Sequence, residues 1–68
     1  MIQTKTIVSD YNNIDNMTNE WICTETKLAR AEGKLLNIVD LIAYHTGHEH
    51  VRCILYKFTD IPIISIPT

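Results

Sequence analysis

One stretch decides the fold of this chain: it reads LLNIVDLIAYH at residues 35–45, TGHE at 46–49 and HVRCILYKF at 50–58. Two runs rich in β-branched and aromatic residues flank a short turn that contains glycine, which is the pattern of a β-hairpin. A two-residue turn with Gly47 first and His48 second predicts type II′ geometry. In that register His45 lies opposite His50.

Both faces of the predicted hairpin are apolar. One face carries Ile38, Asp40, Ile42, Tyr44, Val51, Cys53, Leu55 and Lys57. The other carries Val39, Leu41, Ala43, His45, His50, Arg52, Ile54, Tyr56 and Phe58. One helix covers one face of so small a sheet, and a large apolar patch on the second face is typical of an interface. We therefore expect a homo-oligomer whose interface contains Val39, Leu41, Ile54, Phe58, Ile61, Ile63, Ile64 and Ile66.

The residues before the hairpin predict a strand and a helix. Residues 2–9 are rich in β-branched residues and predict an edge strand. A turn at residues 10–13 follows, and the apolar spacing beyond it predicts one helix with Asn12 or Asn13 as N-cap and Gly33 as C-cap. The alternative is a strand at residues 21–26 with a shorter helix after it. The fold class is α+β, a small β-α-β-β unit with one helix on one sheet face.

Length and sequence divide the chain into one domain and a tail. The 68 residues suffice for a single domain, which we place at residues 1–58. Residues 59–68 form an Ile/Pro-rich tail, in which Pro62 and Pro67 exclude a regular central strand. We expect an extended arm that packs on its own domain or on a neighbouring subunit.

Composition narrows the partners and the compartment. The net charge is −2 and only six residues are Lys or Arg, so we do not expect a nucleic-acid partner. No run reaches the ~20 apolar residues of a membrane-spanning helix, so we expect no membrane partner. The two cysteines, Cys23 and Cys53, are expected to be free thiols that pack as small buried hydrophobes in the cytoplasm.

Polar residues around the hairpin are the candidates for chemistry. The spacing of His45, His48 and His50 matches no strong zinc signature, and no nucleophile–base pair is evident, so we expect no metal, no cofactor and no enzymatic activity. Asp40 on an apolar strand is expected to pair with Lys57 or a backbone amide. A small anionic, nucleotide-like ligand is the candidate for a pocket lined by His45, His50, Arg52, Asp40, Tyr44 and Tyr56.

Three short motifs carry a resemblance to a known family: NEWI at residues 19–22, NIVDLIAY at 37–44 and VRCILYKF at 51–58. Across residues 1–58 the chain resembles a family of very small sporulation-associated proteins of Bacillus that also occurs in phages of low-GC Gram-positive bacteria. Residues 24–34 are longer than the family pattern, and the Ile/Pro tail is additional. The resemblance implies the fold and a mobile-element origin, while the family has no established activity to carry over.

These observations predict a small non-catalytic homo-oligomeric binding protein, encoded by a phage and located in the host cytoplasm. It would block a host protein or sequester a small anionic ligand between subunits. The alternative is a structural or regulatory interaction protein of a sporulating bacterium.

Overall fold

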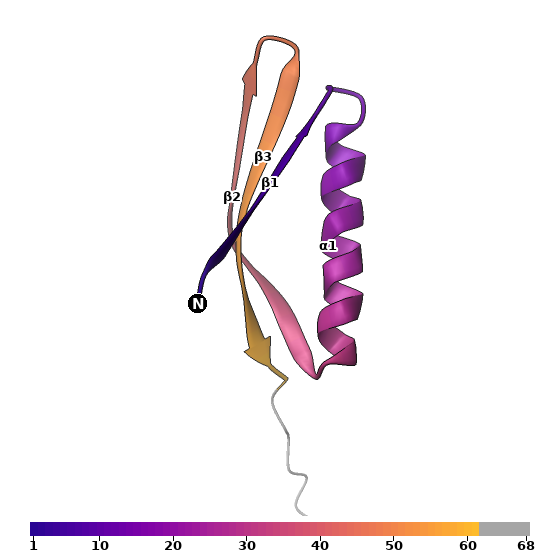
Figure 1. The fold of residues 1–68 in the computed structure, drawn as a ribbon, viewed down its shortest axis with the longest axis vertical. Coiled ribbons are helices and arrows are strands. Elements are labelled where there is room, and N and C mark those ends of the chain that lie inside the picture. The colour runs from indigo at the N-terminus through magenta and orange to yellow at the C-terminus, as the bar shows by residue number, and fades with distance from the viewer. Residues whose placement is uncertain (62–68) are drawn as a thin grey trace, which may run out of the picture.

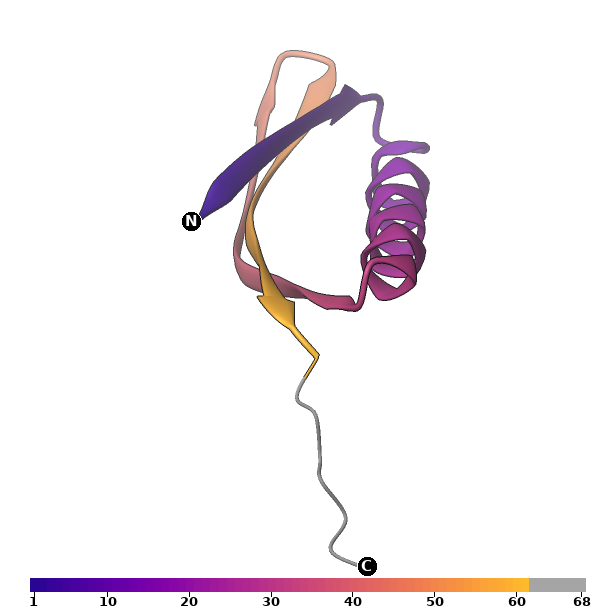
Figure 2. The same cartoon turned by 60° about the horizontal axis from the view of Figure 1, so that its bottom comes forward.

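The computed structural model describes residues 1–61 and has one helix and three strands (Figure 1). In chain order these are β1 (Gln3–Ser9), α1 (Ile14–Ala31), β2 (Lys34–Thr46) and β3 (Glu49–Asp60). The predicted β-α-β-β order and the α+β class are confirmed. Seen from below, the helix forms one layer and the strands the other, joined by the short turn from α1 into β2 (Figure 2).

The sheet is antiparallel, with strand order β1-β3-β2, so the last strand of the sequence is the central one. β1 pairs with β3 from Gln3 opposite Tyr56 to Ser9 opposite His50 without a register shift. As predicted, β1 is an edge strand, and β2 forms the other edge.

The helix is continuous through residues 21–26, so the alternative strand there is wrong. Thr18 and Thr26 donate their hydroxyl protons to the carbonyl oxygens four residues earlier, both at 2.7 Å, which satisfies these polar groups inside the helix. Asn13 is the N-cap residue but makes no side-chain capping bond. Asp10 instead accepts the backbone N–H of Asn13 at 2.9 Å and fixes the turn into α1.

Gly33 ends the helical segment in the left-handed region, at φ 74°. Its N–H bonds to the carbonyl of Arg30 at 3.1 Å, as expected for glycine just beyond a helix. The carbonyl of Gly33 in turn accepts the N–H of Ile61 at 3.1 Å, which ties the end of β3 to the α1–β2 turn.

The core lies between α1 and the sheet. Ile7, Ile14 and Ile54 are buried together, and Trp21, Ile22 and Tyr56 pack against them. The rings of Trp21 and Tyr56 meet edge to face, with centroids 5.0 Å apart. Because β3 is central, Ile54 lies under the helix and is fully buried.

The hairpin register is as predicted from Thr46 opposite Glu49 to Asp40 opposite Leu55. A β-bulge between Ile38 and Asp40 then shifts it, so that Ile38 lies opposite Tyr56. Facing residues of antiparallel strands share a sheet face, so Ile38 lies on the helix side and not, as predicted, with Asp40. The alternation of side chains that the sequence predicts for this strand does not reveal the extra residue of the bulge.

Within residues 1–61 the structure contains no helix with the length and apolar character needed to cross a bilayer.

Candidate protein-binding surface

The most exposed apolar part of the sheet is the upper half of β2. Its large apolar side chains are 41–51% exposed, and we call them the β2 apolar surface: Ile38, Val39, Leu41, Ile42 and Tyr44. Exposed apolar side chains gathered on one element are typical of protein-interaction sites. This strand is therefore the candidate site.

The exposure follows from where the helix lies. The buried cluster under α1 draws its strand residues from β1 and β3, while β2 meets the helix chiefly near the α1–β2 turn (Figure 1). Leu41 faces Ile54 and Ile42 faces Cys53, so these neighbours point to opposite sides of the sheet. Both sides of upper β2 are consequently open to solvent.

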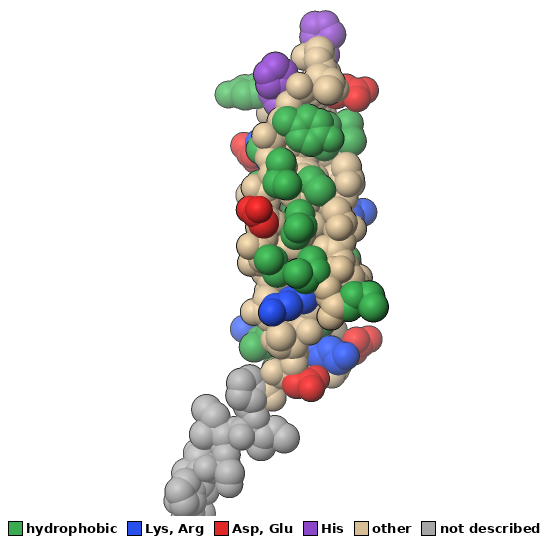
Figure 3. Space-filling model, turned by 90° about the vertical axis from the view of Figure 1, so that its left-hand side faces the viewer, with side chains coloured by type: hydrophobic (Ala, Val, Ile, Leu, Met, Phe, Trp, Pro, Cys, Tyr) green, Lys and Arg blue, Asp and Glu red, His purple; other side chains and the backbone are tan. Residues whose placement is uncertain are grey.

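The side of the sheet away from α1 forms the larger continuous patch. Hydrophobic side chains gather along its middle in Figure 3. On this side Ile42 and Tyr44 of β2 face Cys53 and the buried Val51 of β3, and Val8 of β1, which is 47% exposed, faces Val51 from the other edge. The patch thus spans all three strands.

The free edge of β2 is protected at its centre. In a hairpin closed by a two-residue turn, Leu41, Ala43 and His45 direct their backbone groups to the free edge. The carboxylate of Asp40 accepts the N–H of Leu41 at 2.8 Å, which confirms the backbone-amide alternative for this residue. A bulge and a charged side chain are two devices that keep edge strands from pairing with other chains.

We expect Asp40→Ala to increase edge-to-edge aggregation. The substitution frees the N–H of Leu41 and removes the negative charge from an apolar edge strand, so another strand can add there. Thioflavin T fluorescence of the variant should rise sooner than that of the wild type at equal concentration. Lys57→Ala, which removes a charge from the central strand, serves as the control, and equal aggregation of the two variants would contradict the protective role of Asp40.

The structure does not bring the predicted ligand-binding residues together. His45, His50, Arg52 and Tyr56 lie on the helix side of the sheet, whereas Asp40 and Tyr44 lie on the opposite side. This separation arises because residues of opposite parity on one strand cannot line one pocket. Within one chain the six residues therefore do not line one pocket, and the predicted pocket between subunits stays a prediction.

The polar groups on the helix side already contact other residues of the chain. Arg52 donates to Asp15 of α1 at 3.2 Å, and the Tyr56 hydroxyl donates to Gln3 at 3.2 Å. The ring centroid of His50 lies 5.4 Å from that of Tyr11 and 5.6 Å from that of His45. The contacts of Arg52 and His50 tie the hairpin to α1 and to the β1–α1 turn, and the contact of Tyr56 ties β3 to the start of β1.

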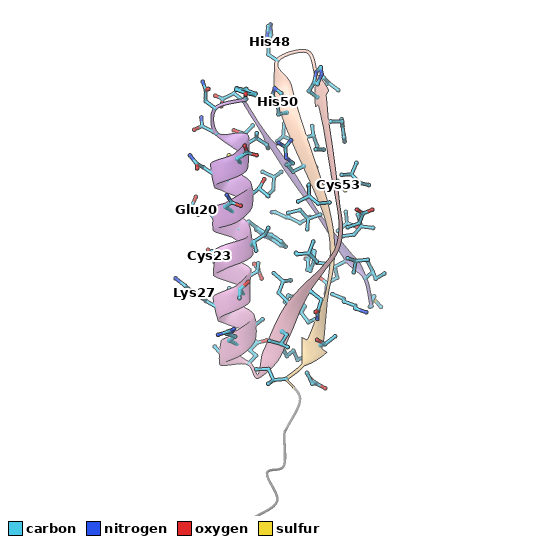
Figure 4. The ribbon with its side chains drawn as sticks, turned by 180° about the vertical axis from the view of Figure 1, so that it is seen from behind. Glu20, Cys23, Lys27, His48, His50 and Cys53 are labelled. Atoms are coloured by element: carbon cyan, nitrogen blue, oxygen red, sulfur yellow. The ribbon has the colours of Figure 1, made fainter. Side chains whose placement is uncertain are left out.

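Histidines and cysteines are spread over the molecule (Figure 4). His48 lies at the tip of the turn, Cys53 on β3 and Cys23 on α1. Both cysteines are free, and Cys23 is exposed, which corrects the expectation that it is a buried hydrophobe. Across the described part of the chain, no three His, Cys, Asp or Glu side chains are grouped so as to hold a metal ion.

The predicted interface residues divide into three groups. Val39 and Leu41 belong to the β2 apolar surface, and Ile61 is 40% exposed. Ile54 is fully buried and cannot contact another molecule, while Phe58 is half-buried and lines the same hollow as Leu28 and Ala29 of α1. Ile63, Ile64 and Ile66 lie outside the described residues.

Sequence reasoning missed Ile38 and Ile42 as exposed apolar residues and placed Tyr44 in a ligand pocket. The alternating pattern shows that both faces are apolar but not which face the helix covers. The edge position of β2 would have indicated that these residues are exposed. That position depends on the pairing of β1 with β3, which the local sequence pattern does not define.

Compared with known proteins, the chain matches no protein-family model, no curated protein and no solved structure. The resemblance to the sporulation-associated family stays a prediction.

Proposed function

We propose that this chain is a small non-catalytic binding protein that acts as a homodimer, with the β2 apolar surface at the contact between the two copies. The observation that carries the proposal is the exposure of these five large apolar side chains on one edge strand. Their burial would remove apolar area from water, which is the main driving force of stable association.

The small size of the core supports a second copy of this chain as the molecule that covers the β2 apolar surface. Within residues 1–61 the buried apolar side chains are Ile7, Ile14, Ala29, Val51 and Ile54. The β2 apolar surface alone holds five large apolar residues, one more than this core, whose fifth member is alanine. A chain of this length buries little apolar area by itself and is therefore marginally stable. Burial of the β2 apolar surface against a second copy would increase the total buried apolar area by a large fraction and stabilise the fold.

A two-fold contact also suits the charges on the open side of the sheet. In such a contact the same patch serves both copies, so residue i of one meets residue j of the other and the reverse. Asp40 and Lys57 lie on this side, with opposite charges, on adjacent strands. A two-fold arrangement can set each Asp40 near the partner copy's Lys57.

Binding to a further protein would then use the outer surfaces of the dimer. Glu20 and Lys27 point away from the sheet in Figure 4, so both helices would present polar faces outward. Covering a partner's surface requires area and complementary charge rather than reacting groups. The resemblance implies a phage origin and a location in the host cytoplasm. The partner that we propose is a host protein whose surface the dimer would block.

Light scattering coupled to size-exclusion chromatography tests the homodimer. The wild type is expected at twice the chain mass of 7.8 kDa, and Tyr44→Glu at the mass of one chain, because a charge buried in the interface is costly to desolvate. Tyr11→Glu is the matched control: Tyr11 is 75% exposed and lies outside the β2 apolar surface, so this variant should remain dimeric. A monomeric wild type, or equal masses for the two variants, would refute the proposal.

A further inference from the structure

A groove lies between β1 and α1, on the side of the molecule away from the β2 edge. It has a volume of about 260 Å³. The residues that line it are Lys5, Thr6, Ile7 and Val8 of β1 together with Met17 and Trp21 of α1. Ile7 belongs to the buried core and Trp21 packs against it, whereas Met17 is 42% exposed. The α1 side of the groove therefore presents a thioether and an aromatic ring to any molecule that enters it.

Lys5 is the one charged residue among those that line the groove. It lies opposite Ile54, the fully buried residue beneath the helix, so its side chain is on the helix side of the sheet. Lys5 is half-buried, as expected when the apolar stem of a lysine packs along apolar groups while its ammonium reaches water. The groove thus combines apolar side chains with a single positive charge.

The ammonium of Lys5 forms no ion pair within the described part of the chain. The acidic side chains of α1, the helix that faces it, are placed elsewhere. Asp15 pairs with Arg52. Glu20 points away from the sheet (Figure 4), and Glu25 lines a separate hollow. Because an opposite charge stabilises an ammonium that is partly removed from water, a negatively charged group of a bound molecule would fit here.

The size and charge of the groove indicate the class of molecule that it suits. Its volume is below the range of about 300–1,000 Å³ that is usual for drug-sized ligands, so the molecule is small. One lysine suits a single negative charge, whereas phosphate groups are commonly held by several donors or by a helix N-terminus. Met17 and Trp21 can pack on an apolar body of variable shape. These features favour a small carboxylate with an aliphatic or aromatic body.

We propose that the groove between β1 and α1 binds a small apolar carboxylate, with its carboxylate beside the ammonium of Lys5 and its apolar body against Met17 and Trp21. The apolar side chains shield the ion pair from water in part, which strengthens it relative to a fully exposed pair. The site lies within one chain and contains no residue of the β2 apolar surface, so it goes beyond the proposed function.

Titration with octanoate tests this site. Trp21 reports on the groove directly, because it is the only tryptophan of the chain. Octanoate, kept below the concentration at which it forms micelles, is expected to change the Trp21 emission saturably. Octanol has the same chain length without the charge and should bind about tenfold more weakly, which corresponds to the loss of one hydrogen bond to a charged group. Isothermal titration calorimetry measures the same two affinities independently of fluorescence.

Two lysine variants test the role of the charge. Lys5→Met keeps an unbranched side chain but removes the ammonium, so it should weaken octanoate binding about tenfold and leave octanol binding unchanged. Lys27→Met is the matched control: it changes the net charge equally, but Lys27 points away from the sheet, so octanoate should bind as to the wild type (Figure 4). Circular dichroism checks that both variants are folded. Absence of saturable octanoate binding, equal affinities for octanoate and octanol, or equal weakening by the two substitutions would overturn the proposal.

Tyr44→Glu separates this site from the proposed homodimer. All of the residues that line the groove belong to one chain, so the folded variant should bind octanoate with the wild-type affinity. A loss of binding in this variant would overturn the placement of the site within a single chain. A monomeric wild type that still binds octanoate would refute the homodimer and leave the carboxylate site supported.

Discussion

Ile54→Ala is expected to lower the free energy of unfolding by about 3 kcal/mol, within the range measured for large-to-small changes in protein cores. Ile54 is 0% exposed, lies on the central strand and contacts the cluster of Ile7 and Ile14 beneath α1. Alanine removes three buried carbon atoms and leaves a cavity that a paired central strand cannot close. For a domain with a few kcal/mol of total stability, a loss of this size leaves a substantial unfolded population.

Urea denaturation followed by far-UV circular dichroism measures this loss. Ile2→Ala provides the matched control, because Ile2 is 55% exposed and precedes β1, so its truncation should change the free energy of unfolding by less than about 0.5 kcal/mol. Equal effects of the two substitutions would show that the core is not centred on Ile54. Both chains should be compared at the same concentration, since association with a second copy adds to apparent stability.

Trp21→Ala is expected to cost about 2–3 kcal/mol of unfolding free energy, somewhat less than a fully buried tryptophan because Trp21 is half-buried. Its ring packs on the core cluster and meets Tyr56 edge to face at 5.0 Å. Tyr56 in turn donates to Gln3 at 3.2 Å, so the tryptophan supports the contact between α1, β3 and the start of β1. Its loss removes the largest side chain from the layer between helix and sheet.

Trp21→Phe should restore at least half of this stability, because phenylalanine keeps an aromatic edge against Tyr56 while losing part of the buried area. The measurement uses circular dichroism rather than fluorescence, since Trp21 is the only tryptophan of the chain. If Trp21→Phe were as unstable as Trp21→Ala, aromatic packing against Tyr56 would not be the source of the stabilisation.

Local sequence signals predicted the elements and much of their pairing. Gly47 fixes a short turn, with φ 59°, and the alternation on either side of it predicts the register down to Asp40 opposite Leu55. The apolar spacing of residues 14–31 outweighed the strand-like composition of residues 21–26, because a continuous helix buries Trp21 and Ile22 on the same side. The bulge at Val39 left no such signal and moved Ile38 to the other face.

The candidate site was predicted only in part. The sequence indicated that the hairpin has more apolar surface than one helix can cover, and it placed Val39 and Leu41 in an interface. It also placed the fully buried Ile54 there. This error arose because the pattern defines which residues share a face but not what lies above that face.

The sequence by itself therefore determined the order of the elements, the hairpin turn and the excess of apolar surface, since these depend on neighbouring residues and short-range periodicity. Only the tertiary structure decided that β1 pairs with β3, that α1 covers the face of Ile54, and that upper β2 is exposed. The physical reason is that two apolar faces are locally equivalent. The choice between them is made by contacts between residues more than forty positions apart, such as Ile7 and Ile54.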